Sequence, residues 1–170
     1  MSVDVQAQVV SSLSEGGASL KVVQNANFGR VVQSPNSVCN FVFEPGNTGK
    51  LIQASQVCAF DDTNAQAPVV NFSCLPGTQF EIHTRQAQTG LGVTFPLDGL
   101  EVLDPAADIT WEVLFGDKND LQLGVTCGSA ANSGGQVVSD VQLDLRMSVQ
   151  AGDSAVGSDI SATTVLDVVY

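Results

Sequence analysis

The sequence has little positive charge. Only six of its 170 residues are Lys or Arg, against 18 Asp and Glu, and the formal net charge is −12. Binding to phosphate requires a clustered cationic surface, so nucleic acid is a poor partner, and an anionic membrane surface is disfavoured for the same reason. The cations are instead scattered along the chain: Lys21, Arg30, Lys50, Arg85, Lys118 and Arg146. The acidity is typical of a soluble surface or extracellular protein.

Histidine is almost absent as well. A Ser–His triad or a Cys–His dyad would have to use His83, the single histidine, and no G-x-S-x-G motif surrounds any serine. One histidine and no C-x-x-C pair leave no spacing for a zinc site. We therefore expect His83 to be an ordinary strand residue beside Glu81 and Arg85, and the protein to be neither an enzyme nor the carrier of a cofactor or metal.

Acidic pairs are the remaining source of catalytic groups. A glycosidase needs two carboxylates at a fixed separation, and two sets could supply them: Asp61 with Asp62, and Asp98, Glu101, Asp104 and Asp108. We expect both sets to be solvated loop carboxylates. The oxygen-rich stretch 117–120 lacks the spacing and final glutamate of a calcium-binding EF-hand loop, and we expect a turn there.

Aromatic residues make up only 6% of the chain, and long apolar runs are missing. A sugar-binding platform usually exposes several rings, for which Trp111 and Tyr170 are the natural candidates. Trp111 alternates with Val113 and Phe115, which favours a place in the core. No apolar run approaches the ~20 residues of a membrane helix. The start at Met1 does not resemble a leader peptide, so either a leader has been removed or the sequence begins at the mature end.

The sequence is rich in period-two alternation of apolar and polar residues, which indicates β-strands. Hydrophobic residues make up 44% of the chain, enough for one core, and we expect a single all-β domain over residues 1–170. Short strands separated by Gly and Pro turns suit a sandwich or barrel. We predict strands near 18–24, 28–33, 38–43, 51–59, 68–74, 78–84, 91–95, 109–115 and 120–127, and a helical turn at 104–108.

The alternation is clearest at the two ends of the chain. Apolar residues recur at every second position in the segment 3–9, and Leu13 continues the first register. Near the other end, segments 137–149 and 158–170 alternate in the same way and flank a stretch rich in glycine and small polar residues. We predict that these two segments form a closing hairpin.

Four cysteines, an even number, favour two disulfides and hence an oxidising compartment. If 38–43 and 51–59 pair around the Pro45–Gly49 turn, Cys39 and Cys58 fall nearly opposite each other, and cross-strand neighbours on one face are close enough to be bridged. Cys74 and Cys127 are then left as partners by elimination.

Four features, in their order along the chain, resemble bacterial pilin-like domains of the chaperone–usher type, especially the spore-coat-protein-U and related secreted families. They are the alternating arm from Val3 to Leu13, the step Asn27-Phe28-Gly29-Arg30-Val31-Val32, the strand–Pro/Gly turn–strand unit of residues 69–82, and the closing hairpin of residues 137–149 and 158–170, which ends on the aromatic Tyr170.

The resemblance implies an immunoglobulin-like sandwich that lacks one strand, with residues 1–13 as a donor arm and 14–170 as the body. The arm of one subunit would fill the groove of the next by β-augmentation. The arm residues would be Val3, Val5, Ala7, Val9 and Leu13, and the groove wall would be Ile160, Ala162, Thr164, Leu166, Val168 and Tyr170. A periplasmic chaperone and an outer-membrane usher are the implied assembly partners. The implied product is a head-to-tail homopolymer, a fimbrium on the cell surface that serves adhesion or biofilm formation.

Two alternatives remain open. Residues 3–13 could be the first strand of their own domain, because alternation alone does not say which molecule a strand pairs with. The protein could also be a secreted sandwich that binds a carbohydrate or another ligand rather than a filament subunit.

Overall fold

The protein consists of β-strands without a helix wherever its chain is described. The computed structural model describes residues 2–12, 17–32, 38–46, 51–53, 59–85, 93–116, 120–129, 134–149 and 160–169. Its strands are β1 (Ser2–Ser12), β2 (Ala18–Gln24), β3 (Ala26–Val32), β4 (Cys39–Phe43), β5 (Leu51–Gln53), β6 (Ala59–Asp61), β7 (Val69–Cys74), β8 (Gln79–Arg85), β9 (Val93–Thr94), β10 (Leu97–Val102), β11 (Ile109–Gly116), β12 (Asp120–Cys127), β13 (Val137–Leu145), β14 (Met147–Val149) and β15 (Ile160–Val169). The expected all-β class is confirmed.

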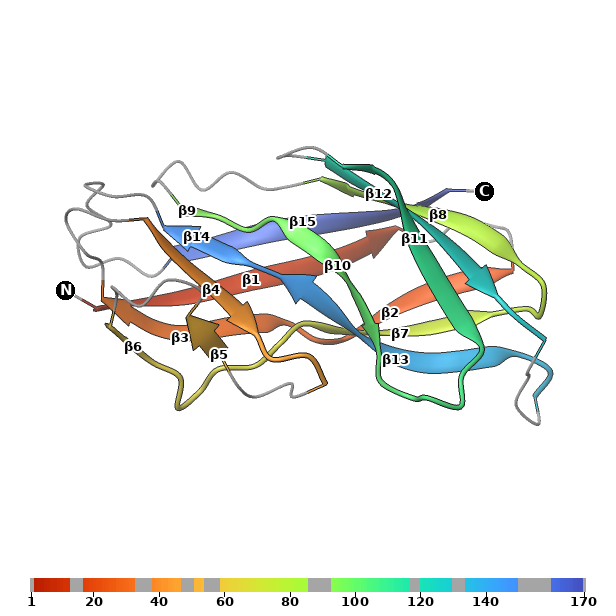
Figure 1. Cartoon of the computed structure of the whole chain (residues 1–170), viewed down its shortest axis with the longest axis horizontal. Helices are drawn as coiled ribbons and strands as arrows, with labels where there is room; N and C mark the ends of the chain where they lie inside the picture. Colours follow the sequence, from red (N-terminus) through yellow and green to blue (C-terminus); the bar gives the residue numbers. More distant parts are fainter. Residues whose placement is uncertain are drawn as a thin grey trace.

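The largest sheet has seven strands in the order β11-β12-β8-β15-β1-β3-β6. The N-terminal strand β1 is parallel to the C-terminal strand β15 and antiparallel to β3. Both β1 and β15 run along the long axis of the molecule, from left to right in Figure 1. The two ends of the chain therefore form the middle of one sheet.

Two four-stranded sheets make up the rest, in the orders β10-β13-β7-β2 and β5-β4-β14-β9. They follow one another along the molecule (Figure 1), because β13 leads into β14 with only Arg146 between them. Opposite this break, Pro96 separates β9 from β10, and its carbonyl accepts a hydrogen bond of 2.8 Å from the Arg146 amide. Proline has no N–H to donate to a ladder, which accounts for the interruption.

Six of the eight phenylalanines are buried in the core. A seventh, Phe60, packs against it and meets Phe41 edge to face at 5.4 Å between ring centroids. At one end Phe28 lies 4.8 Å from Phe43 and 5.5 Å from Phe95 between ring centroids. At the other end Phe72 of β7 and Phe80 of β8 meet edge to face at 6.3 Å. Such tilted pairs are favoured by the ring quadrupole. Since β7 and β8 belong to different sheets, the rings join the two layers of a β-sandwich.

A disulfide between Cys74 and Cys127 also joins the layers, because it links the ends of β7 and β12. The expected pairing of these two cysteines is confirmed. Cys39 is disulfide-bonded too, and its predicted partner Cys58 lies outside the described residues. The hairpin that suggested this second pairing is present, since β4 and β5 pair antiparallel from Phe41–Gln53 to Phe43–Leu51.

The predicted closing hairpin is wrong. β13 pairs with β7 and β10, and β14 pairs with β4 and β9, whereas β15 lies in the other sheet between β8 and β1. Alternation identifies a strand and its buried face but not its neighbour. Two strong strands that follow each other in the sequence here belong to opposite layers.

Two smaller expectations also need correction. Residues 97–102, treated as loop, form β10, whose Leu97 and Leu100 are buried while Asp98 and Glu101 face solvent. The expected helical turn at 104–108 is a non-helical turn in which the Asp104 carboxylate accepts a 2.9 Å hydrogen bond from the Ala106 amide. That contact is an Asx turn, which competes with helix formation.

Trp111 is not in the core as predicted. It is 36% exposed, and Val113, Leu114 and Phe115 on the same strand are about half exposed. The reason is position: β11 is the last strand of the seven-stranded sheet, and beyond Ile109 all of its residues are exposed. Alternation predicted a strand correctly but could not show that the strand lies at an edge.

Candidate subunit-assembly site

The position of β1 is the feature of the fold with the clearest bearing on assembly. β1 lies in the interior of the seven-stranded sheet, with eight residue pairs to β15 and six to β3. Removing it would split the sheet and leave two unpaired edges facing each other. Between them would lie a gap one strand wide.

The register brings the predicted arm and the predicted groove wall together. Val5 pairs with Ile160, Ala7 with Ala162, and Val9 with Thr164. On β15 the same alternate positions continue to Leu166 and Val168, which are buried at 0% and 5% exposure. The apolar alternate residues of the arm are thus paired with alternate residues of β15. Further along β15, the residues at these alternate positions are buried in the core.

The remaining residues of the predicted site are only partly accounted for. Val3 pairs with Val31 of β3, on the side away from β15. Leu13 and Tyr170 lie outside the described residues. In the single chain, residues 2–12 are a strand of their own molecule, as the first alternative expected, and the implied groove is occupied by the chain's own β1. Donation of this strand to a neighbour stays a prediction.

A β-bulge in β3 shapes the other wall of the gap. The pairing shifts between Val5–Gly29 and Gln6–Asn27, so that Phe28 has no partner on β1. Gly29 has φ of +67°, a conformation that glycine adopts readily, and its amide donates a 2.8 Å hydrogen bond to Asn27 Oδ1. The Asn-Phe-Gly sequence was noted only for its resemblance to a family, and the bulge was not predicted.

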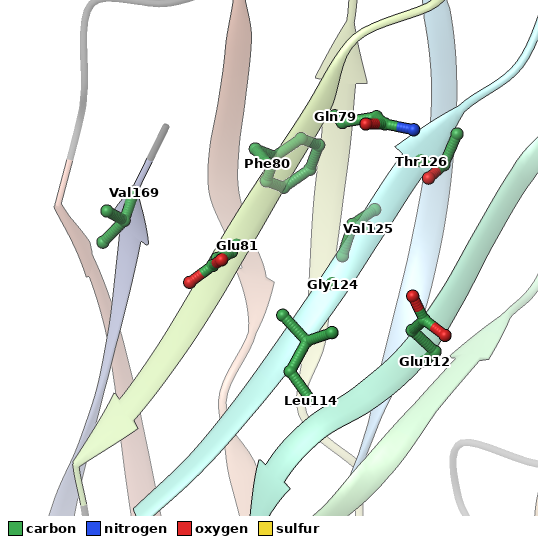
Figure 2. A pocket seen from close by; sticks show the side chains of 9 residues that line it. All are labelled: Gln79, Phe80, Glu81, Glu112, Leu114, Gly124, Val125, Thr126 and Val169. Atoms are coloured by element: carbon green, nitrogen blue, oxygen red, sulfur yellow. The ribbon is translucent and has the colours of Figure 1, made fainter.

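A shallow pocket of about 270 Å³ lies on the outer face of the seven-stranded sheet, at the end away from β6. Figure 2 shows side chains from β8, β11, β12 and the end of β15 around it. Glu112, Gly124, Glu81 and Val169 form one row across these strands. Leu114 covers Gly124, with its side chain 3.3 Å from where a Cβ would stand. The carboxylates of Glu112 and Glu81 therefore lie on either side of Gly124 in this row.

The surroundings of His83 are those of a partly exposed strand residue. It lies in β8, and its Nε2 is 2.7 Å from Oε2 of Glu81, both side chains being partly exposed. Asp167 and Gln122 are its partners on the neighbouring strands. Thr84, the next residue of β8, is buried and points to the opposite face. No nucleophile is positioned by the imidazole among these contacts.

The two carboxylate sets are separated by the fold. Asp61 ends β6, where its Oδ1 accepts a hydrogen bond from the Thr63 amide, whereas Asp98 and Glu101 lie on β10 in the other layer. Asp108 is used structurally, because its Oδ2 accepts a 2.8 Å hydrogen bond from the Ser129 amide. Asp61, Asp62, Asp98 and Glu101 are exposed, as expected for solvated carboxylates, although three of them are on strands rather than in loops.

One acidic group that the sequence did not single out has a perturbed pKa. Burial raises the pKa of the Asp144 carboxyl, and the charges of Asp98 and Glu101 raise it further. Arg146 forms an ion pair with Asp98, Nε to Oδ2 at 3.2 Å. This small charged cluster lies where β10 and β13 pair, outside the pocket.

Comparison with known proteins finds no match. No family model, no curated protein and no solved structure is significantly similar to this chain. No group of three or more metal-ligating side chains occurs in the part of the chain that the structure describes. The same residues contain no helix long and apolar enough to cross a membrane.

Proposed function

We propose that this protein is a structural subunit of an extracellular filament, in which copies are joined by exchange of β1. The observation that carries the proposal is the interior position of β1, which lies between β15 and β3. In the exchanged state β1 of one copy would lie between β15 and β3 of the next, with the same pairs as in the single chain. The sequence resemblance to chaperone–usher pilins, which implies an immunoglobulin-like sandwich, also supports assembly by strand exchange.

The energetics of such an exchange follow from the register. Because the pairs within one molecule and between two molecules are the same, the exchange gains little free energy by itself and is driven by protein concentration. It also requires β1 to leave two neighbouring strands, so we expect slow conversion of monomers. A chaperone that holds the gap open before β1 closes it would remove this barrier, in line with the implied assembly partners.

The geometry is compatible with a linear polymer. β1 enters the gap parallel to β15, and both strands follow the long axis (Figure 1). A head-to-tail contact of this kind uses two different surfaces, so it need not close into a ring. The disulfides favour assembly in an oxidising compartment. Secretion, a fimbrial location and a role in adhesion are part of the proposal.

A covalent clamp on β1 tests the proposal directly. Gln8 and Thr163 are Cα partners, and Gln8→Cys with Thr163→Cys would tie β1 to its own β15. The matched control is Gln8→Ser with Thr163→Ser. We expect negative-stain microscopy to show fibres after prolonged incubation of concentrated wild-type and control protein, and isolated particles for the clamped variant. Fibres from the clamped variant, or none from the wild type, would refute strand exchange.

The ligand-binding alternative has one observation in its favour, the exposure of Trp111. Exposed tryptophan rings are common in sugar-binding sites, although no aromatic side chain other than the buried Phe80 lines the pocket of Figure 2. A binding module predicts that a saccharide raises the melting temperature of the wild type and not of Trp111→Ala. A panel of saccharides that leaves both unchanged would remove this alternative.

A further inference from the structure

The free edge of β11 differs from the other sheet edges. Eight large hydrophobic residues are exposed in the described part of the chain, and four of them lie on this one strand: Trp111, Val113, Leu114 and Phe115. β11 has eight residues, and β12 pairs with one side of it only. A long apolar edge with unpaired N–H and C=O groups is a template for another strand.

The other edges are protected in the ways that natural sheets use. β5, β6 and β9 have three residues or fewer. β10 exposes Asp98 and Glu101, and β2 exposes Lys21. β11 has no lysine and no proline, and Glu112 is its only charge. Its single protective feature is a bulge between Val113 and Phe115, which leaves Ile109 to Val113 in regular register.

We infer that β11 is a lateral contact site for a second copy of this chain, which pairs through its own β11. The unpaired backbone requires an extended strand. Exposed apolar residues on both faces of β11 require a strand with apolar residues on both faces, and β11 itself has this character. Two identical strands that run antiparallel around a two-fold axis bring the same surface together.

Charge limits where a second copy can bind. Two molecules of net charge −12 repel each other, so they can approach closely only where charge is sparse. β11 brings one carboxylate from each copy to the contact. Higher ionic strength therefore strengthens this contact by screening the repulsion, whereas salt would weaken a contact with a basic partner.

The inference does not depend on strand exchange, because β11 and β1 are separate strands of the sheet with three others between them. The two contacts also differ in kinetics. Exchange requires β1 to leave its sheet, so exchanged polymers persist on dilution. Edge pairing opens no strand and reverses at once.

A matched pair of lysine substitutions tests the inference. Val113 is 51% exposed on β11, and Val23 is 56% exposed on the edge strand β2. Both Val113→Lys and Val23→Lys place a charge on an exposed site, so both variants should fold. In sedimentation over a wide concentration range, we expect wild type and Val23→Lys to dimerise reversibly and more strongly at high salt, and Val113→Lys to stay monomeric.

Hydrogen exchange gives a second readout at the strand itself. In concentrated wild-type protein, we expect the amides of β11 that face away from β12 to exchange about tenfold more slowly than in dilute protein. A wild type that stays monomeric under all conditions, or a Val113→Lys variant that dimerises as the wild type does, overturns the inference. So does dimerisation without protection of β11.

Discussion

The indole ring of Trp111 lies directly against Gly99. A Cβ added to Gly99 would stand 2.7 Å from Cη2 of the ring, closer than side-chain atoms approach in proteins. Gly99 is buried in β10, at the edge of one layer, and Trp111 belongs to β11, at the edge of the other. The glycine thus sets how closely the two layers meet at this corner of the sandwich.

Gly99→Ala should therefore destabilise the protein. Overpacking of this kind costs roughly 1–3 kcal/mol. Trp111 is the single tryptophan, so its fluorescence during urea denaturation reports on the site. In a Trp111→Leu background, followed by circular dichroism, the same substitution should cost less because the ring is gone. Equal losses in both backgrounds would show that Gly99 is not constrained by Trp111.

The bulge beside β1 allows the conformational and steric roles of glycine to be separated. Gly29 and Gly77 both have positive φ, but a Cβ at Gly29 would collide with the backbone carbonyl of Asp61, while Gly77 has open space around it. Gly77→Ala should lower the free energy of unfolding only by the cost of placing an alanine in the left-handed conformation, about 1–2 kcal/mol. Gly29→Ala should cost clearly more in the same urea titration. Similar losses would contradict a tight β3–β6 contact at the bulge.

The disulfide between the layers should contribute strongly to stability. Cys74 and Cys127 are 53 residues apart, and closing a loop of this length in the unfolded chain is worth about 4 kcal/mol. We expect Cys74→Ala with Cys127→Ala to lose a free energy of this order in guanidinium denaturation, and to keep the all-β circular dichroism spectrum. A loss below about 1 kcal/mol would mean that the unfolded chain is already compact.

Asp144 should make the protein less stable as the pH rises. Its pKa is raised in the folded state by burial and by Asp98 and Glu101, so folding favours the protonated carboxyl. The destabilisation that comes from ionising this carboxyl is absent at a pH below the ordinary pKa of aspartate and is complete at a pH above the raised pKa. Asp144→Asn should thus raise the free energy of unfolding at neutral pH, and with it the melting temperature. The gain in free energy should be less than about 1 kcal/mol because the site is partly exposed.

The control for this prediction is Asp62→Asn, which changes the net charge equally at an exposed position. It should give a smaller gain at neutral pH. At a pH below the ordinary range of aspartate, Asp144→Asn should no longer differ from the wild type. A gain that persists in acid would point to a cause other than the carboxyl charge.

Local patterns in the sequence determine where the strands of this protein lie, whereas the pairing of the strands depends on segments that are distant in the sequence. Alternation located most strands to within a few residues, since side chains of a strand point alternately to core and solvent. It did not identify neighbours: the segments 137–149 and 158–170 are strands, yet they lie in different sheets. It missed β10 because a bulge between Leu97 and Leu100 interrupts the period.

The candidate assembly site shows the same division. The alternating arm and the alternating last strand were both recognised from the sequence, and the fold places them side by side in register. The bulge at Gly29 was not recognised, because one glycine in a strand can serve several purposes. The exposed edge at β11 was mistaken for core, since the pattern of Trp111, Val113 and Phe115 is that of any half-buried strand.

By itself, the sequence determined the class of the protein: all-β, acidic and disulfide-bonded, with strands wherever apolar and polar residues alternate. These properties depend on composition and on neighbours within a few residues. Only the tertiary structure decided that the first and last strands meet in the middle of one sheet and that β11 is left at its edge. Strand pairing is a choice among distant segments with similar patterns, and it is settled by how two layers pack around a common core.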